Sequence, residues 1–246
     1  NQYHCWVCGI KGANLYKLVR KYSPENLKEY VENFDRRKNT FSDDLEAPIE
    51  DEKVSIPAGF KMLAHSLKSP DPDIKSCIQY VLDRGLTVRD MWKFRLGTCA
   101  SGRYRRRVIV PSFDNNGDLN YFAARSIDST TTMKYMNSKR PKKTVIFNEI
   151  SIDWKKTLTI VEGPFDLVKC DENSTCLLGS TFGKSFRLFD KIVTNRTPVV
   201  LALDPDASSK THKFAKLLTS YGISVKIMEV APWSDVGEMT KSEFLN

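Results

Sequence analysis

Several classes of protein are excluded by what the 246-residue sequence lacks. It has no run of about 18 apolar residues, which a membrane-spanning helix requires. Its first eight residues hold two cysteines and no apolar core, so the pattern of a secretory signal peptide is missing. We find no internal repeat and no low-complexity tract. With 41% hydrophobic and 28% charged residues, the composition is typical of a soluble globular protein of one or two domains.

Cysteine is scarce and scattered, and among the six cysteines only Cys5 and Cys8 lie close together. This spacing is not that of a disulfide framework, so we expect the reducing environment of a cytoplasm. The other four lie singly in different predicted elements, where cysteines more often pack than bind metal. We therefore assign no site to the remaining cysteines, Cys77, Cys99, Cys170 and Cys176.

Acidic residues are in deficit, because 38 lysines and arginines accompany 30 aspartates and glutamates, which gives a net charge of +8. Such a surplus suits a polyanionic partner, since each phosphate that is neutralised releases counterions. Many basic proteins bind no nucleic acid, so the charge alone leaves the partner open.

The pattern along the chain divides it into four pieces. Residues 1–20 hold the cysteine pair, and residues 21–57 contain a helix that begins near Ser23 and then an acidic linker punctuated by prolines. Residues 58–156 change from helices to strands, and residues 157–246 alternate strands with helices. We take these four ranges as the predicted domain boundaries.

The third piece opens with two helices. The first covers residues 76–82 and is followed by Gly85, a typical residue at a helix end. Thr87 caps the second, which runs through the apolar residues Val88, Met91 and Trp92.

Strands follow in both later pieces. Residues 108–110 and 119–123 flank Asn116-Gly117, and this arrangement is a strong hairpin signal. Three apolar strands separated by helical stretches then cover residues 158–161, 199–203 and 224–230. Apolar strands that alternate with helices indicate a parallel sheet with crossover helices.

Acidic residues come after these three strands. Glu162 follows the first, Asp204 and Asp206 follow the second, and Asp235 and Glu238 follow the third at a short distance. In an open parallel sheet, ligands bind beyond the carboxyl ends of the strands. Carboxylates about 6 Å apart repel by about 2–3 kcal/mol at an effective dielectric constant of about 20, and a divalent cation removes that cost. Oxygen ligands favour Mg²⁺ or Mn²⁺, although a single acid at a strand end is also common as a solvated turn residue.

Two of these acidic segments resemble the Toprim domain, which DnaG-type primases and topoisomerases share. Residues 158–166 (LTIVEGPFD) resemble its first motif, and residues 204–207 (DPDA) resemble its Asp-x-Asp motif. The resemblance implies that Glu162, Asp204 and Asp206 bind the catalytic metal. Residues 234–238 (SDVGE) are similar to the later acidic primase motif but lack its usual lysine, and they imply Asp235 as a further metal ligand.

The third piece resembles the primase catalytic core and separates this reading from other Toprim enzymes. Its motifs run in family order: residues 80–87 (YVLDRGLT), 94–97 (FRLG), 104–111 (YRRRVIVP), 116–125 (NGDLNYFAAR) and 133–138 (MKYMNS). With the Toprim segments, the resemblance covers about residues 75–246. Nucleotidyl transfer also needs cations on the triphosphate and the template. The candidates are Arg105, Arg106, Arg107, Arg125 and Lys134, although a solvated basic face is the alternative for the arginine run.

Residues 3–9 (YHCWVCG) resemble the second knuckle of the primase zinc ribbon. Two thiolates spaced in this way form half of a tetrahedral zinc site, with Cys5 and Cys8 as ligands. The resemblance places the first knuckle about twenty residues upstream, so either the chain begins inside the ribbon, which we expect, or the cysteine pair is vestigial. Zn²⁺ is implied only if the ribbon is complete in the full-length protein.

Taken together, the resemblance implies an α/β protein with a Toprim domain, a mixed α+β basic N-terminal lobe and a partial zinc ribbon. It implies a primase that uses Mg²⁺ or Mn²⁺ to make short RNA primers from NTPs on single-stranded DNA, most like the primases of tailed phages. A replicative helicase partner and the cytoplasm of a bacterial or phage-infected cell follow from the same resemblance. The alternatives are a Toprim nuclease or other DNA-processing enzyme, and a nucleic-acid-binding protein without catalysis.

Overall fold

A computed structural model describes residues 3–4, 11–12, 19, 23–26, 53–170, 173–179, 182–230, 232–233 and 235–245 of the chain. The chain divides into two compact units, Asn1–Glu52 and Lys53–Asn246. The second unit contains all of the predicted acidic and basic site residues.

In the first unit, strand β1 (Tyr3–His4) pairs with β2 (Lys11–Gly12) in antiparallel fashion. A short 3₁₀ helix, η1 (Pro24–Asn26), begins at the predicted helix start. The two predicted zinc ligands, Cys5 and Cys8, lie outside the described residues, as does most of the predicted acidic linker. The zinc site therefore stays a prediction.

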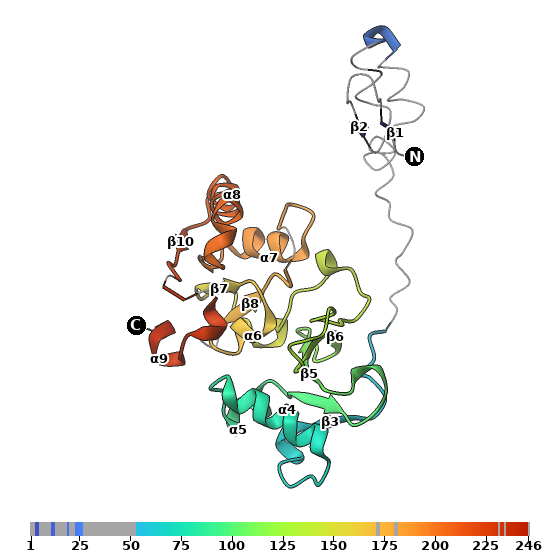
Figure 1. Ribbon diagram of the computed structural model, residues 1–246. Helices are drawn as coiled ribbons and strands as arrows, with labels where there is room; N and C mark the ends of the chain where they lie inside the picture. Colours follow the sequence, from blue (N-terminus) through green and yellow to red (C-terminus); the bar gives the residue numbers. More distant parts are fainter. Residues whose placement is uncertain are drawn as a thin grey trace. The chain divides into compact units, whose positions relative to one another are not determined.

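An antiparallel sheet in the order β3-β4-β5-β6 forms the first half of the second unit (Figure 1). Its strands are β3 (Phe60–Met62), β4 (Gly97–Cys99), β5 (Arg107–Phe113) and β6 (Leu119–Ser126). The predicted hairpin is confirmed, with Val110 opposite Ala123. Its turn is held by Asp114, whose carboxylate accepts hydrogen bonds from the backbone N–H groups of Asn116 and Asp118.

Two helices lie between β3 and β4 in the chain: α4 (Pro72–Asp83) and α5 (Val88–Lys93). The side chain of Asp71 caps α4 by accepting two backbone hydrogen bonds, and Thr87 and Asp90 form a reciprocal capping box at the start of α5. Residues on one side of α4 recur at helical spacing and are buried: Ile74, Cys77, Ile78 and Val81.

The apolar side chains of α5 are less buried than those of an amphipathic helix usually are. Met91 is fully buried, whereas Val88 is 37% exposed and Trp92 is 49% exposed. The buried side of the helix is instead completed by Asp90, the acid of its capping box. Of the three apolar residues in α5, only Met91 thus faces the core, whereas Val88 and Trp92 are exposed.

A parallel sheet in the order β10-β9-β7-β8 forms the second half of the unit. Its strands are β7 (Leu158–Val161), β8 (Ser174–Cys176), β9 (Val199–Ala202) and β10 (Val225–Ile227). Its helices are α6 (Pro164–Leu167), α7 (Arg187–Asn195), α8 (Ser208–Thr219) and α9 (Lys241–Leu245). The predicted parallel sheet is confirmed, with one strand, β8, that the sequence pattern did not indicate.

Helices cover both faces of this sheet, with α7 and α8 on one side and α6 and α9 on the other (Figure 1). Alternate strand residues separate accordingly, because successive side chains in a strand point to opposite faces. Ile160 and Leu201 join the core with α7 and α8, whereas Val161 and Ala202 join a core that extends into the antiparallel half.

The two halves share that second core, which includes Leu63 and Tyr121 from one half and Phe165 and Phe244 from the other. The boundary predicted at residue 157 therefore separates two lobes of one compact unit. The 3₁₀ helices in the described part of this unit are η2 (Leu63–His65), η3 (Gly102–Tyr104), η4 (Lys142–Thr144), η5 (Glu149–Ser151), η6 (Pro205–Ala207), which precedes α8, and η7 (Val236–Glu238). In the part of the chain that the structure describes, we find no helix with the length and apolar character to cross a bilayer.

Candidate active site

Three carboxylates meet at the carboxyl ends of two neighbouring strands. Strands β7 and β9 run side by side, with Val161 opposite Ala202. Glu162 directly follows β7, and Asp204 and Asp206 follow β9, so the sheet itself brings the three together. One carboxylate oxygen from each residue lies within 4.8 Å of the other two. The arrangement expected from the strand ends is therefore present in the fold.

The environment of Asp204 fits a hard divalent cation. Its Oδ1 atom is buried and has no hydrogen-bond partner. Burial raises the pKa of the Asp204 carboxyl to about 7, and the charges of Asp166 and Glu162 act in the same direction. A buried oxygen without a partner costs free energy, and a bound cation would remove that cost. Because the donors are all carboxylate oxygens, the set suits Mg²⁺ or Mn²⁺ rather than a softer metal.

Asp166 is a fourth acid at this site, and the sequence analysis gave it no role. It lies in the first turn of α6, where its Oδ2 atom accepts a 2.8 Å hydrogen bond from the backbone N–H of Gly163. Burial raises the pKa of Asp166 to about 6, the charge of Asp235 adds to the rise, and Arg125 opposes it. Its position four residues after Glu162, one turn into a helix, is the signal that could have identified it.

Asp235 approaches the cluster from η7 without joining the close group of three. Its carboxylate accepts a 2.9 Å hydrogen bond from the backbone N–H of Glu238, whose own side chain is exposed. A Cβ atom built on Gly237 would lie 2.9 Å from Oδ1 of Asp166 and 3.0 Å from Oδ1 of Asp235. The two acids thus converge on a backbone position where only glycine fits without a shift.

Arg125 lies near the end of β6, and its positive charge acts to lower the pKa of Asp166. Its guanidinium lies 5.5 Å from the ring centroid of Phe165 and donates a 2.9 Å hydrogen bond to the hydroxyl of Tyr135. Lys134 has an exposed side chain, and its carbonyl accepts a hydrogen bond from Ser126 on the edge of β6.

Two further cations stand near the acids, and both were missed by the sequence analysis. The Arg84 guanidinium lies 5.3 Å from the Phe165 ring centroid, and its Nη1 atom lies 3.7 Å from the position of a Cβ atom on Gly237. Nζ of Lys142 donates a 2.6 Å hydrogen bond to the carbonyl of Leu178. The next residue, Gly179, donates a hydrogen bond from its backbone N–H to the carbonyl of Glu162. Their positions depend on how the lobes pack, which no local pattern reveals.

The arginine run at residues 105–107 differs in role along its length. Arg106 pairs with Asp73 at 2.8 Å and with Asp128 at 2.6 Å, and its hydrogen bonds lower the pKa of both carboxyls. Arg105 also pairs with Asp73, but its side chain is 57% exposed. Arg105 and Arg106 therefore form an ion-pair network on the surface of the antiparallel lobe.

Arg107, which is predicted to bind NTP or template, occupies a buried position. It is only 7% exposed. Its guanidinium donates hydrogen bonds to the carbonyls of Ala124, Met133 and Lys134 at 3.4, 3.0 and 3.2 Å. These bonds help to hold the segment around Lys134 against β6, and the binding of NTP or template by Arg107 stays a prediction.

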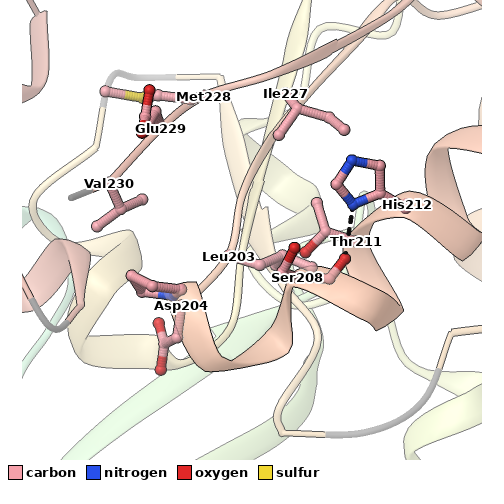
Figure 2. Close-up of a pocket in the computed structure, with 10 residues that line it drawn as sticks. Leu203, Asp204, Ser208, Thr211, His212, Ile227, Met228, Glu229 and Val230 are labelled. Carbon is pink, nitrogen blue, oxygen red and sulfur yellow. Dashed lines mark hydrogen bonds between the residues drawn. The ribbon is translucent and has the colours of Figure 1, made fainter.

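A cavity of about 420 Å³ lies beside Asp204, between α8 and the segment that follows β10. Figure 2 shows Asp204 at one end and Ile227 and His212 at the other. The imidazole of His212 is bonded through Nδ1 to the carbonyl of Ser208 at 2.8 Å. The cavity gives the acid cluster a neighbouring concave space at the end of the sheet, where ligands of parallel α/β folds bind.

Comparison with known proteins points to one kind of enzyme. No protein-family model matches the chain. The DNA primase of Listeria innocua is 20% identical in an alignment that covers 88% of this chain and 44% of that protein. The DNA primase of Enterobacteria phage T4 is 23% identical in an alignment that covers 98% of this chain and 72% of that protein. The chain thus spans less than half the length of the bacterial relative.

Solved structures give the same picture for the fold. The RNA polymerase domain of Mycobacterium tuberculosis primase DnaG matches with a TM-score of 0.58 at 16% identity, over 74% of this chain and 77% of that one. The zinc-binding and RNA polymerase domains of Aquifex aeolicus primase match with a TM-score of 0.57 at 23% identity, over 99% and 72%. A DnaG catalytic domain bound to ssDNA matches with a TM-score of 0.54 at 20% identity, over 71% and 74%. The chain is thus similar in sequence to DNA primases, and its fold is similar to that of solved DnaG primase domains.

Proposed function

We propose that this chain is the catalytic part of a DNA primase and makes short RNA primers from NTPs on a single-stranded DNA template. The observation that carries the proposal is the meeting of Glu162, Asp204 and Asp206 within 4.8 Å at the ends of β7 and β9. Strand-end carboxylates in this arrangement, next to a set of arginines and lysines, are what metal-dependent nucleotidyl transfer requires.

In this proposal, Glu162, Asp204 and Asp206 hold a Mg²⁺ or Mn²⁺ ion, and Asp235 completes the acidic site together with Asp166. A divalent ion bound there would stabilise the attacking and leaving oxygens of the transfer. The acids themselves fix where the ion lies, because two of them are anchored to the ends of paired strands. Asp166 is held by its bond to the Gly163 N–H, so its free oxygen has a defined direction.

The cations act on the phosphates of the nucleotide and template. Arg125 is oriented by its hydrogen bond to Tyr135 and by its contact with Phe165, next to the acids. We assign Arg125, Arg84 and Lys142 to the triphosphate, because each contacts residues that adjoin the acid cluster. We assign the exposed Lys134 and Arg105 to the template strand, where exposed cations contribute through phosphate contacts.

The proposal includes finer features. The parallel lobe is a Toprim domain and the antiparallel lobe is the basic N-terminal lobe of the primase core. A solved DnaG catalytic domain was obtained with ssDNA, which supports the same kind of template for this chain. Cys5 and Cys8 would supply half of a zinc site, a replicative helicase is the expected partner, and the chain would act in the cytoplasm of a bacterial or phage-infected cell.

A comparison of two substitutions tests the assignment of the acids. Asp204→Asn should abolish RNA synthesis and leave binding of single-stranded DNA within a few-fold of wild type, because the residue holds metal rather than template. Asp190→Asn, an exposed aspartate on α7, serves as the matched control and should retain synthesis. Synthesis retained by Asp204→Asn would reject this site. Cleavage of the DNA with no RNA product would favour a nuclease instead.

A further inference from the structure

A basic and aromatic surface on α5 is unused by the site described above. It comprises His65, Val88, Arg89, Trp92 and Lys93, all of which are exposed. The buried side of α5 is formed by Asp90 and Met91, so the other residues of this six-residue helix face outward. We refer to these five residues as the α5 surface.

The side chain of Trp92 is largely exposed to solvent instead of being packed in the core. Its side chain is 49% exposed, although a tryptophan ordinarily contributes to stability by burying a large apolar area. Its ring is nevertheless held in place, because the ring of His65 meets it edge to face, with centroids 4.4 Å apart and planes at 84°. Val88, one turn earlier on the same side of the helix, is 37% exposed and extends the apolar area. The result is an oriented aromatic ring open to solvent.

The exposed side of α5 carries two basic residues beside Trp92. Arg89 and Lys93 are four residues apart and therefore neighbours on the exposed side of α5. The helix has one acid, Asp90, which is buried and accepts hydrogen bonds from the backbone N–H and the hydroxyl of Thr87. The α5 surface therefore combines an oriented aromatic ring with two exposed cations, a combination that suits a ligand with both aromatic bases and phosphates.

We propose that the α5 surface binds unpaired nucleotides of the single-stranded DNA template. A base stacks on the indole of Trp92, and Arg89 and Lys93 contact the adjoining phosphates. An exposed aromatic ring flanked by cations suits single strands because every base has a face that can stack, whereas the bases of a duplex are already stacked on each other. The inference rests on the proposed function for the identity of the strand, and it adds a second contact with the template outside the acid cluster.

The test measures binding of a fluorescein-labelled oligo(dT) to the full chain by anisotropy, without NTPs. Trp92→Ala should weaken binding about 5- to 100-fold, the range expected for loss of one stacking contact. Trp92→Phe should retain most of the affinity because a smaller aromatic ring still stacks. Arg89→Gln combined with Lys93→Gln should lower the slope of log affinity against log salt by about 1.4, or about 0.7 for each phosphate of a single strand.

Two controls separate this effect from others. Tyr221→Ala removes an aromatic side chain that is 44% exposed in the parallel lobe, and it should leave oligo(dT) binding unchanged. Thermal unfolding of each variant verifies that it is folded. In wild type, oligo(dT) should quench more tryptophan fluorescence than it does in Trp92→Phe, because Trp6, Trp154 and Trp233 provide a common background.

Affinity of Trp92→Ala equal to that of wild type would overturn the inference, as would equal quenching by duplex DNA. An acidic protein segment as the true partner would produce the first of these results. Because the assay contains no NTPs, it is independent of the proposed activity. Loss of binding in Trp92→Ala, in a protein whose Asp204→Asn variant still makes RNA, would support the α5 surface and reject the acid site.

Discussion

The carboxyl group of Asp204 lies where the fold opposes its negative charge. Burial and the nearby acids raise its pKa to about 7, and burial raises that of Asp166 to about 6. The folded state therefore binds protons more tightly than the unfolded chain, in which an aspartate has a pKa near 3.9. In the absence of metal, the contribution of these two carboxyls to stability is greatest below the pKa of the unfolded chain and declines as the pH rises through about 4 to 7.

This linkage gives a prediction for metal-free protein. The melting temperature should decrease as the pH rises from 5.5 to 8. Mg²⁺ or Mn²⁺ should raise the melting temperature more at pH 8 than at pH 5.5, since the cation binds the ionised acids. Asp204→Asn should reduce both effects, whereas Asp190→Asn should not. Differential scanning fluorimetry provides the measurement. A metal-induced shift of equal size at both pH values would contradict the assigned site.

Gly237 supplies a second prediction at the scale of one residue. A methyl group there would lie 2.9 Å from an oxygen of Asp166 and 3.0 Å from one of Asp235, so it should displace both acids. Gly237→Ala should weaken Mn²⁺ binding about 10- to 100-fold, as is typical when the support of a metal site is disturbed. Isothermal titration measures the affinity.

The matched control is Gly183→Ala, because a Cβ atom on Gly183 would meet nothing within 4 Å. It should bind Mn²⁺ as wild type does. If both variants bound Mn²⁺ normally, Asp166 and Asp235 would have no part in holding the metal.

At the scale of elements, the segment around Lys134 is attached to β6 mainly through backbone contacts. Met136 N–H binds the carbonyl of Ala124, and Ser126 N–H binds that of Lys134. Arg107 adds three hydrogen bonds to carbonyls from a buried position. Arg107, from the neighbouring strand β5, therefore reinforces the backbone contacts that hold the segment.

Substitutions of Arg107 and Lys134 should separate structure from function. Arg107→Met removes the donors and leaves buried carbonyls without partners, so it should lower the free energy of unfolding by about 2–4 kcal/mol in urea denaturation. Lys134→Met changes an exposed residue and should alter stability by less than about 0.5 kcal/mol while reducing RNA synthesis. A normal free energy of unfolding for Arg107→Met would contradict this structural role of Arg107.

The elements that could be predicted from the sequence are those with strong local signals. Strands β5 and β6 flank an Asn-Gly turn, and β7 and β9 are apolar runs that end in acids. Strands β3, β4 and β8 have only three residues each, which is too short for an alternating pattern. The exposure of Trp92 could not be predicted, because an apolar pattern in a helix does not say how much of it the fold covers.

At the scale of the whole molecule, the candidate site is assembled from both lobes of the second unit. The acids follow strands of the parallel sheet, so their meeting could be predicted from strand ends and sheet topology. Arg84 and Arg125 come from the antiparallel lobe and contact the ring of Phe165 at 5.3 and 5.5 Å. Their position relative to the acids arises from a core shared by the two lobes, and such contacts over long stretches of chain leave no local pattern.

The most direct test of the central claim is synthesis of labelled RNA on single-stranded DNA with Mg²⁺ or Mn²⁺, comparing wild type with Glu162→Gln. We expect a ladder of short RNA products from wild type and none from Glu162→Gln, with Asp190→Asn unchanged. RNA synthesis by Glu162→Gln at the wild-type rate would contradict the account.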